Sequence, residues 1–102
     1  MYSDNKTTEF KELDLAELLD TEEKMIDYLN AELAEGDPHY IKVALMAIAR
    51  ARDLDIVAQR AGMKPSEINK ALANKSNPKY ITIQKILNAL DLQLMVVANP
   101  EV

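Results

Sequence analysis

The sequence predicts an all-α fold, a compact bundle of five helices followed by a short C-terminal strand. Glycine occurs only twice in 102 residues, and Ala, Leu and Ile supply most of the 48% hydrophobic content, a composition that favours helices. Apolar residues recur three and four positions apart, which is the spacing of one helix face. The length is enough for one small domain with a modest core and hardly enough for two.

The first helix is expected from Thr21 to Ala34. Asp20, with Glu23 three residues later, resembles a capping box at its start. Gly36 is well placed as the left-handed residue that ends it. One face of this helix carries the apolar residues Met25, Leu29 and Leu33.

The second helix is expected from Pro38 to Arg52. Asp37 is predicted as its N-cap. Pro38 suits the first helical turn, because a backbone amide at that position would have no hydrogen-bond partner within the helix. Because the link after the first helix is so short, the two helices should pack as neighbours. The residues expected in its buried face are Ile41, Leu45, Ile48 and Ala49.

Three shorter helices should complete the bundle, at Ile56–Ala61, Pro65–Ala73 and Thr82–Leu90. Gly62 marks the turn between the first two, and a polar loop, Asn74–Pro78, precedes the third. The last helix has the clearest spacing, with apolar residues at Ile83, Ile86, Leu87 and Leu90. Its entry is expected at Thr82 or at Tyr80-Ile81. We also expect four methionines to fill the core, namely Met25, Met46, Met63 and Met95.

Both ends of the chain differ from this helical centre. Residues 1–19 are expected to form an acidic arm whose leucines could cap the core, and residues 99–102 a tail. Leu92–Ala98 alternates in the manner of a strand, and a lone strand is not stable in water. We therefore expect a homodimer, with Leu92–Ala98 or the helix Thr82–Leu90 as its contact.

The net charge of −5 conceals two regions of opposite sign. Met1–Asp37 holds 12 Asp or Glu against 3 Lys, a net charge of −9, whereas Ile56–Leu90 holds 6 Lys or Arg against 1 Glu, a net charge of +5. This division suggests two partners, a basic one for the acidic region and a polyanion for the basic centre. The alternative is that both sets of charges are solvated helix faces that only keep the chain soluble.

A helix-turn-helix is predicted at residues 55–73. Three residues have the structural roles that this motif needs: Ala58 is small where the second helix crosses, Gly62 makes the turn, and Ile68 faces inward. The surface that remains is rich in hydrogen-bonding groups suited to double-stranded DNA. The candidate DNA-binding residues are Lys64, Pro65, Ser66, Glu67, Asn69, Lys70, Lys75, Asn77 and Lys79. A helical adaptor that binds only proteins, and in which this motif is structural, is the alternative.

Residues Phe10 to Val97 resemble the probable addiction-module antidote proteins, helix-turn-helix antitoxins encoded beside a small RelE/HigB-like toxin. The most specific pieces are Gly36-Asp37-Pro38, Ala49-Arg50-Ala51-Arg52, Ala58 with Gly62, and Asn77-Pro78. The resemblance implies a Cro/repressor-type, lambda-repressor-like domain, neutralisation of a cognate basic toxin, and repression of the protein's own operator. The chain departs from the family at Asp53, where Gly is usual, and at Lys64-Pro65, where a Ser-Arg type of helix start is usual.

Other classes of function find little support in the sequence. There is no Cys, and the single His39 lacks neighbours at ligand spacing, so we expect no metal and no cofactor. No nucleophile–base pair can be assembled, and acidic pairs such as Glu22-Glu23 belong to a solvated helix face. We therefore expect that the protein is not an enzyme. The longest apolar run is too short to cross a membrane and the first residues are polar, so we expect neither a membrane span nor a signal peptide, and a cytoplasmic location.

Overall fold

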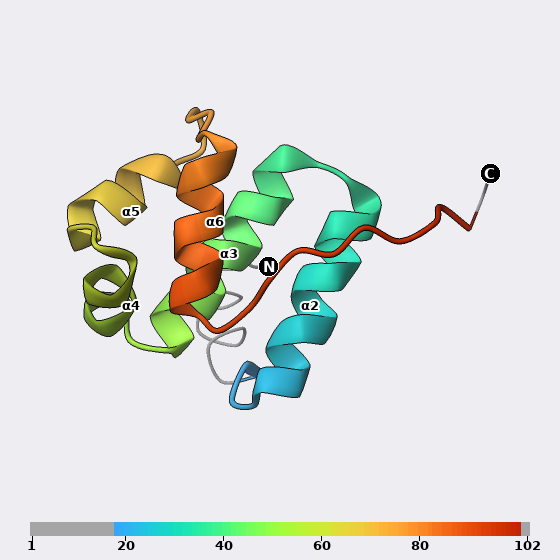
Figure 1. Ribbon diagram of the computed structural model, residues 1–102, viewed down its shortest axis with the longest axis horizontal. Coiled ribbons are helices and arrows are strands. Elements are labelled where there is room, and N and C mark those ends of the chain that lie inside the picture. The colour runs from blue at the N-terminus through green and yellow to red at the C-terminus, as the bar shows by residue number, and fades with distance from the viewer. Residues whose placement is uncertain (1–17, 101–102) are drawn as a thin grey trace, which may run out of the picture.

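The computed structural model describes residues 18–100 and shows five helices within them (Figure 1). The all-helical, five-helix prediction is therefore confirmed for this part of the chain, whereas most of the expected acidic arm, residues 1–17, lies outside it. The helices are α2 (Glu22–Glu35), α3 (Pro38–Ala51), α4 (Leu54–Ala61), α5 (Pro65–Ala71) and α6 (Tyr80–Ala89).

Helix α2 begins and ends at residues suited to capping. The N-cap is Thr21, whose hydroxyl accepts a hydrogen bond from the Lys24 amide at 3.2 Å, so the expected capping box of Asp20 and Glu23 is wrong. The Asp20 carboxylate instead pairs with the Lys24 ammonium at 2.9 Å. Gly36 ends the helix with a φ of +79°, as the sequence predicts.

Helix α3 supplies the centre of the core. Asp37 caps it by accepting from the His39 amide at 2.9 Å, and Pro38 is its first residue, both as predicted. Its inner face packs against α2 and α4. Burying one Leu or Ile side chain contributes about 1.5–3 kcal/mol, so this face is a main source of stability. The fully buried residues of α3 are Ala44, Leu45, Ile48 and Ala49.

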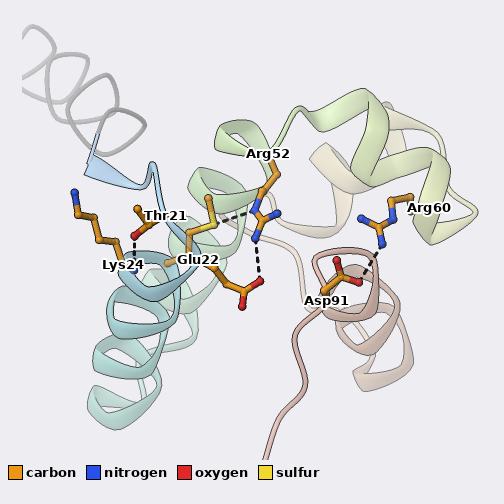
Figure 2. Close-up of polar contacts among 7 residues, drawn as sticks. Thr21, Glu22, Lys24, Arg52, Arg60 and Asp91 are labelled. Carbon is orange, nitrogen blue, oxygen red and sulfur yellow. Dashed lines mark hydrogen bonds and ion pairs between the residues drawn. The ribbon is translucent and has the colours of Figure 1, made fainter.

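An arginine at the end of α3 ties it to the start of α2. The guanidinium of Arg52 donates to the sulfur of Met25 at 3.2 Å and to the carboxylate of Glu22 at 3.3 Å (Figure 2). Leu19, just before α2, is also buried, as expected of a residue that caps the core.

Helix α4 packs against both α5 and α6 and completes the core. Helix α4 starts two residues earlier than the sequence pattern indicates, with Asp53 as its N-cap. Helix α6 starts at Tyr80, the earlier of its two expected entries, with Lys79 as its N-cap. Helix α5 ends at Ala71, two residues before the expected end, because Leu72 already leaves helical geometry. The buried anchors of these three helices are Val57, Ala58, Ile68, Ile86, Leu87 and Ala89.

The end of α6 is closed by an aspartate in an uncommon conformation. Asp91 has a φ of +61°; its amide donates to Asn88, and the following amide, of Leu92, donates to the Leu87 carbonyl at 2.9 Å. This pair of bonds is a Schellman motif with a non-glycine residue in the left-handed position. The Asp91 carboxylate also accepts from Arg60 of α4 at 3.0 Å, which links the ends of the two helices (Figure 2).

The predicted C-terminal strand is wrong. Residues 92–98 are not helical and form no strand pairing within the described part of the chain; they run as an extended segment past α2 (Figure 1). The alternating pattern could only become a strand beside a second one, and residues 18–100 supply none. Met95, expected in the core, is 77% exposed, and the residue of this segment that packs against the buried core is Leu92.

No helix among residues 18–100 is long and apolar enough to cross a membrane.

Candidate nucleic-acid interface

Helices α4 and α5 are joined by a tight turn that begins at Gly62. The Gly62 amide donates to the Gln59 carbonyl at 3.2 Å, and the Met63 amide donates to the Ala58 carbonyl at 2.9 Å. These bonds form a Schellman motif, in which Gly62 has a φ of +69°. A side chain added at Gly62 would meet nothing within 4 Å, so this position requires glycine for its backbone conformation and not for space.

The two other residues to which the sequence gives a structural role in this region are both buried. Ala58 is buried where α4 meets the rest of the bundle, and Ile68 is fully buried on the inner side of α5. Burial of Ile68 fixes which side of α5 faces outward.

The outward side of α5 carries a stripe of exposed polar residues. Ser66, Asn69 and Lys70 stand at i, i+3 and i+4 and are all exposed. They offer a hydroxyl, an amide and an ammonium, which are groups that hydrogen-bond to base edges and phosphates.

The start of α5 differs in its chemistry from the rest of the helix. Pro65 is its first residue and half-buried, and Lys64 is its exposed N-cap. The Glu67 carboxylate accepts a hydrogen bond from the Lys64 backbone amide at 2.8 Å, so Glu67 caps this helix. That bond gives Glu67 a structural role in addition to its place on the outward face.

The loop between α5 and α6 continues the polar surface. Lys75 and Asn77 are exposed in the loop, and Lys79 is exposed at the N-cap of α6. In Figure 1 this loop stands above the end of α5 and beside the start of α6. The sequence-predicted residues thus follow one another along the surface from the start of α5 to the start of α6.

A residue that the sequence reasoning missed holds this loop in place. Lys42 of α3 is only 7% exposed, and its ammonium donates to the carbonyl oxygens of Ala73 at 3.0 Å, Asn74 at 2.9 Å and Ser76 at 2.7 Å. All three hydrogens of the ammonium therefore have partners. The signal available in the sequence was a lysine three residues before Leu45 and seven before Ala49, on the apolar face of α3.

Ser76 closes the same loop from within. Its hydroxyl lies 2.5 Å from the Ala71 carbonyl oxygen and 2.7 Å from that of Ala73. The shape of the loop is therefore set by buried or half-buried groups, whereas its lysines remain on the surface.

The charge of this surface is strongly positive. Residues 64–79 contain four lysines, all exposed, against Glu67 alone. Two arginines of the chain are used elsewhere, because Arg52 pairs with Glu22 and Arg60 pairs with Asp91. The arrangement can bind a polyanion. The described residues hold no cluster of three or more side chains that could ligate a metal ion.

Comparison with known proteins gives two matches and one negative result. A family model described as probable addiction module antidote protein matches residues 9–98. A protein of Haemophilus influenzae, itself uncharacterised, is 40% identical over 90 residues, which cover 88% of this chain and 93% of that protein. No solved structure matches.

Proposed function

Since the chain belongs to the family of probable addiction module antidote proteins, we propose that it is an antitoxin with two binding surfaces. One surface binds and neutralises a small basic toxin encoded in the same operon. The other binds the operator DNA of that operon and represses it. The protein would act in the cytoplasm, where both partners are available.

The observation that carries the DNA-binding part is the geometry of α4 and α5. The turn at Gly62 and the burial of Ala58 and Ile68 support a helix-turn-helix with α5 as the recognition helix. In that arrangement Ser66, Asn69 and Lys70 face the major groove.

Phosphate contacts would come from the lysines around the recognition helix. Lys64, Lys75 and Lys79 are exposed at the start of α5, in the loop and at the start of α6, where they can flank the groove. Asn77 can add a hydrogen bond from the same loop. Pro65 contributes no amide, so the contacts at the start of α5 differ from those of a Ser-Arg type of helix start.

Operator binding also favours a homodimer. One recognition helix covers a half-site only, and a two-fold dimer places a second copy of α5 one helical turn of DNA away. The contact surface is either α6 or the extended segment 92–98.

The experiment is a fluorescence-anisotropy titration with the duplex upstream of the operon and with a scrambled duplex of equal composition. We expect binding to the upstream duplex to be at least about 10³-fold tighter, with an affinity that falls linearly on a log–log plot against salt. Equal and weak affinity for both duplexes would contradict repression and favour a helical adaptor that binds only proteins. Growth rescue on co-expression with the adjacent toxin gene tests the antitoxin role separately.

A further inference from the structure

A groove of about 610 Å³ lies between α2 and the C-terminal segment, which we define as residues 91–98. Its α2 wall is mainly apolar and includes Ile26 and Leu33, and its other wall includes Met95 and Val97. Figure 1 shows the C-terminal segment running past α2, on the side of the molecule away from α5. The groove is therefore a separate feature from the candidate DNA-binding surface.

The C-terminal wall of the groove presents unusually exposed apolar groups. Met95 is 77% exposed and Val97 is 71% exposed, although both line the groove. Exposed apolar residues that are neighbours in space mark interaction sites more often than isolated ones do. No backbone hydrogen bond described for residues 18–100 involves positions 93–98, so this extended backbone is free to pair with another strand.

The rim of the groove along α2 is acidic. Helix α2 and its flanks are acidic overall, since residues 20–37 contain seven Asp or Glu against Lys24 alone, and two of these acidic residues lie on the rim. At 100° per residue, Glu23 and Asp27 lie just beyond the groove-lining positions Glu22 and Ile26, on the open edge. Both side chains are exposed, and neither forms an ion pair within the described part of the chain.

The acidic groups that line the groove form ion pairs, unlike those on its rim. Glu22 pairs with Arg52 and Asp91 pairs with Arg60, so these two carboxylates already have cations of their own chain (Figure 2). The free negative charge is thus concentrated on the outer edge, where an incoming partner would meet it first.

We infer that this groove binds the toxin, by accepting a strand-forming apolar segment flanked by Lys or Arg. The inference rests on the proposed antitoxin function and adds the surface and the chemistry of the toxin segment. A second copy of this chain fits less well, because a two-fold contact would bring the acidic rims of both copies together. The homodimer contact then belongs to α6, and toxin and DNA can bind at the same time on opposite sides of the molecule.

The test uses the purified toxin encoded beside this gene and measures its affinity by calorimetry. Glu23→Gln with Asp27→Asn removes two rim charges, and Glu32→Gln with Glu35→Gln is the matched control on the opposite side of α2. We expect the rim variant to bind the toxin at least roughly tenfold more weakly at low salt, and the control to bind as the wild type does. Operator affinity should be unchanged in both, which also shows that both are folded.

A second pair of variants tests the apolar wall. Met95→Ser should weaken toxin binding, whereas Val96→Ser should not, because Val96 is 97% exposed and does not line the groove. If the wild type and all variants bind the toxin with equal affinity, the groove is not the toxin-binding site, although the antitoxin role is still supported. Conversion of a dimer to a monomer by Met95→Ser without loss of toxin affinity would assign the groove to a second copy. Failure of the wild-type protein to bind the toxin would overturn both proposals.

Discussion

The ammonium group of Lys42 lies 2.7 Å from the carbonyl oxygen of Ser76, so a residue of α3 holds the loop that precedes α6. This contact spans 34 positions of sequence and is one of three that the same ammonium makes to the loop backbone. The loop carries Lys75 and Asn77 of the proposed DNA contact surface. The buried cation therefore supports the functional surface without belonging to it.

Replacement of Lys42 by Met should lower the free energy of unfolding by roughly 2–3 kcal/mol. The three carbonyl groups would lose a charged donor that methionine cannot replace, and at least one would remain buried without a partner. Urea unfolding followed by circular dichroism measures the change. Lys85→Met, on the exposed side of α6, is the control and should stay within about 0.5 kcal/mol of the wild type. Similar values for the two variants would show that the loop needs no donor from α3.

Replacement of Asp53 by glycine should stabilise the protein, although Asp53 caps α4. Its φ of +81° and ψ of 103° are costly for a residue with a side chain, and its carboxylate caps α4 by accepting from the Asp55 amide at 3.1 Å. Asp53→Gly removes the strain and loses only a few tenths of a kcal/mol of capping, so we expect a net gain of about 0.5–1 kcal/mol. Asp53→Ala keeps the strain, loses the cap and should be about 1 kcal/mol less stable than the wild type. A glycine variant that melts below the alanine variant would contradict this account.

The pKa of Asp20 should rise when Lys24 loses its charge. The Lys24 ammonium, by its hydrogen bond and its charge, lowers the pKa of the Asp20 carboxyl below the ordinary 3.8. Because the folded-state pKa is the lower one, this interaction favours folding above about pH 3.8 and is lost as the pH falls through the folded-state value. An NMR titration of the carboxyl carbon should show a pKa near 3.8 in Lys24→Met and a value still lowered in Lys24→Arg. An unchanged pKa in the methionine variant would assign the shift to another cause.

Local signals in the sequence were sufficient for most of the helical fold. Four local signals predicted helix ends and starts correctly, because each acts within one turn of its own position. They are the left-handed Gly36 and Gly62, the N-cap Asp37 and the first helical residue Pro38. Lys79 could not be recognised as the start of α6 because its side chain makes no capping bond, whereas Asp53 is a favoured N-cap type whose carboxylate does cap α4.

Features that depend on distant contacts could not be predicted in the same way. The alternating pattern of Leu92–Ala98 allows this segment to form a strand only beside a second strand, and residues 18–100 contain none. Lys42 was missed because its partners follow it by more than thirty positions. The placement of Ser66, Asn69 and Lys70 on the outward face of α5 follows from the burial of Ile68 and was predicted, whereas their contacts with bases remain a prediction.

The central claim is that α5 reads base sequence while the lysines around it bind phosphates, and paired variants can separate these roles. Asn69→Ala should cost on the order of 1–3 kcal/mol on the operator and little on random DNA, with the salt dependence kept. Lys79→Ala should weaken both DNAs alike and reduce the slope of log affinity against log salt by about one.

The most direct measurement is therefore the ratio of operator to random-DNA affinity for the wild type and these two variants, by fluorescence anisotropy at several salt concentrations. Asn69→Ala should lower this ratio by about 5- to 150-fold, whereas Lys79→Ala should leave it unchanged. Equal ratios in all three proteins would contradict the assignment of α5 as the recognition helix.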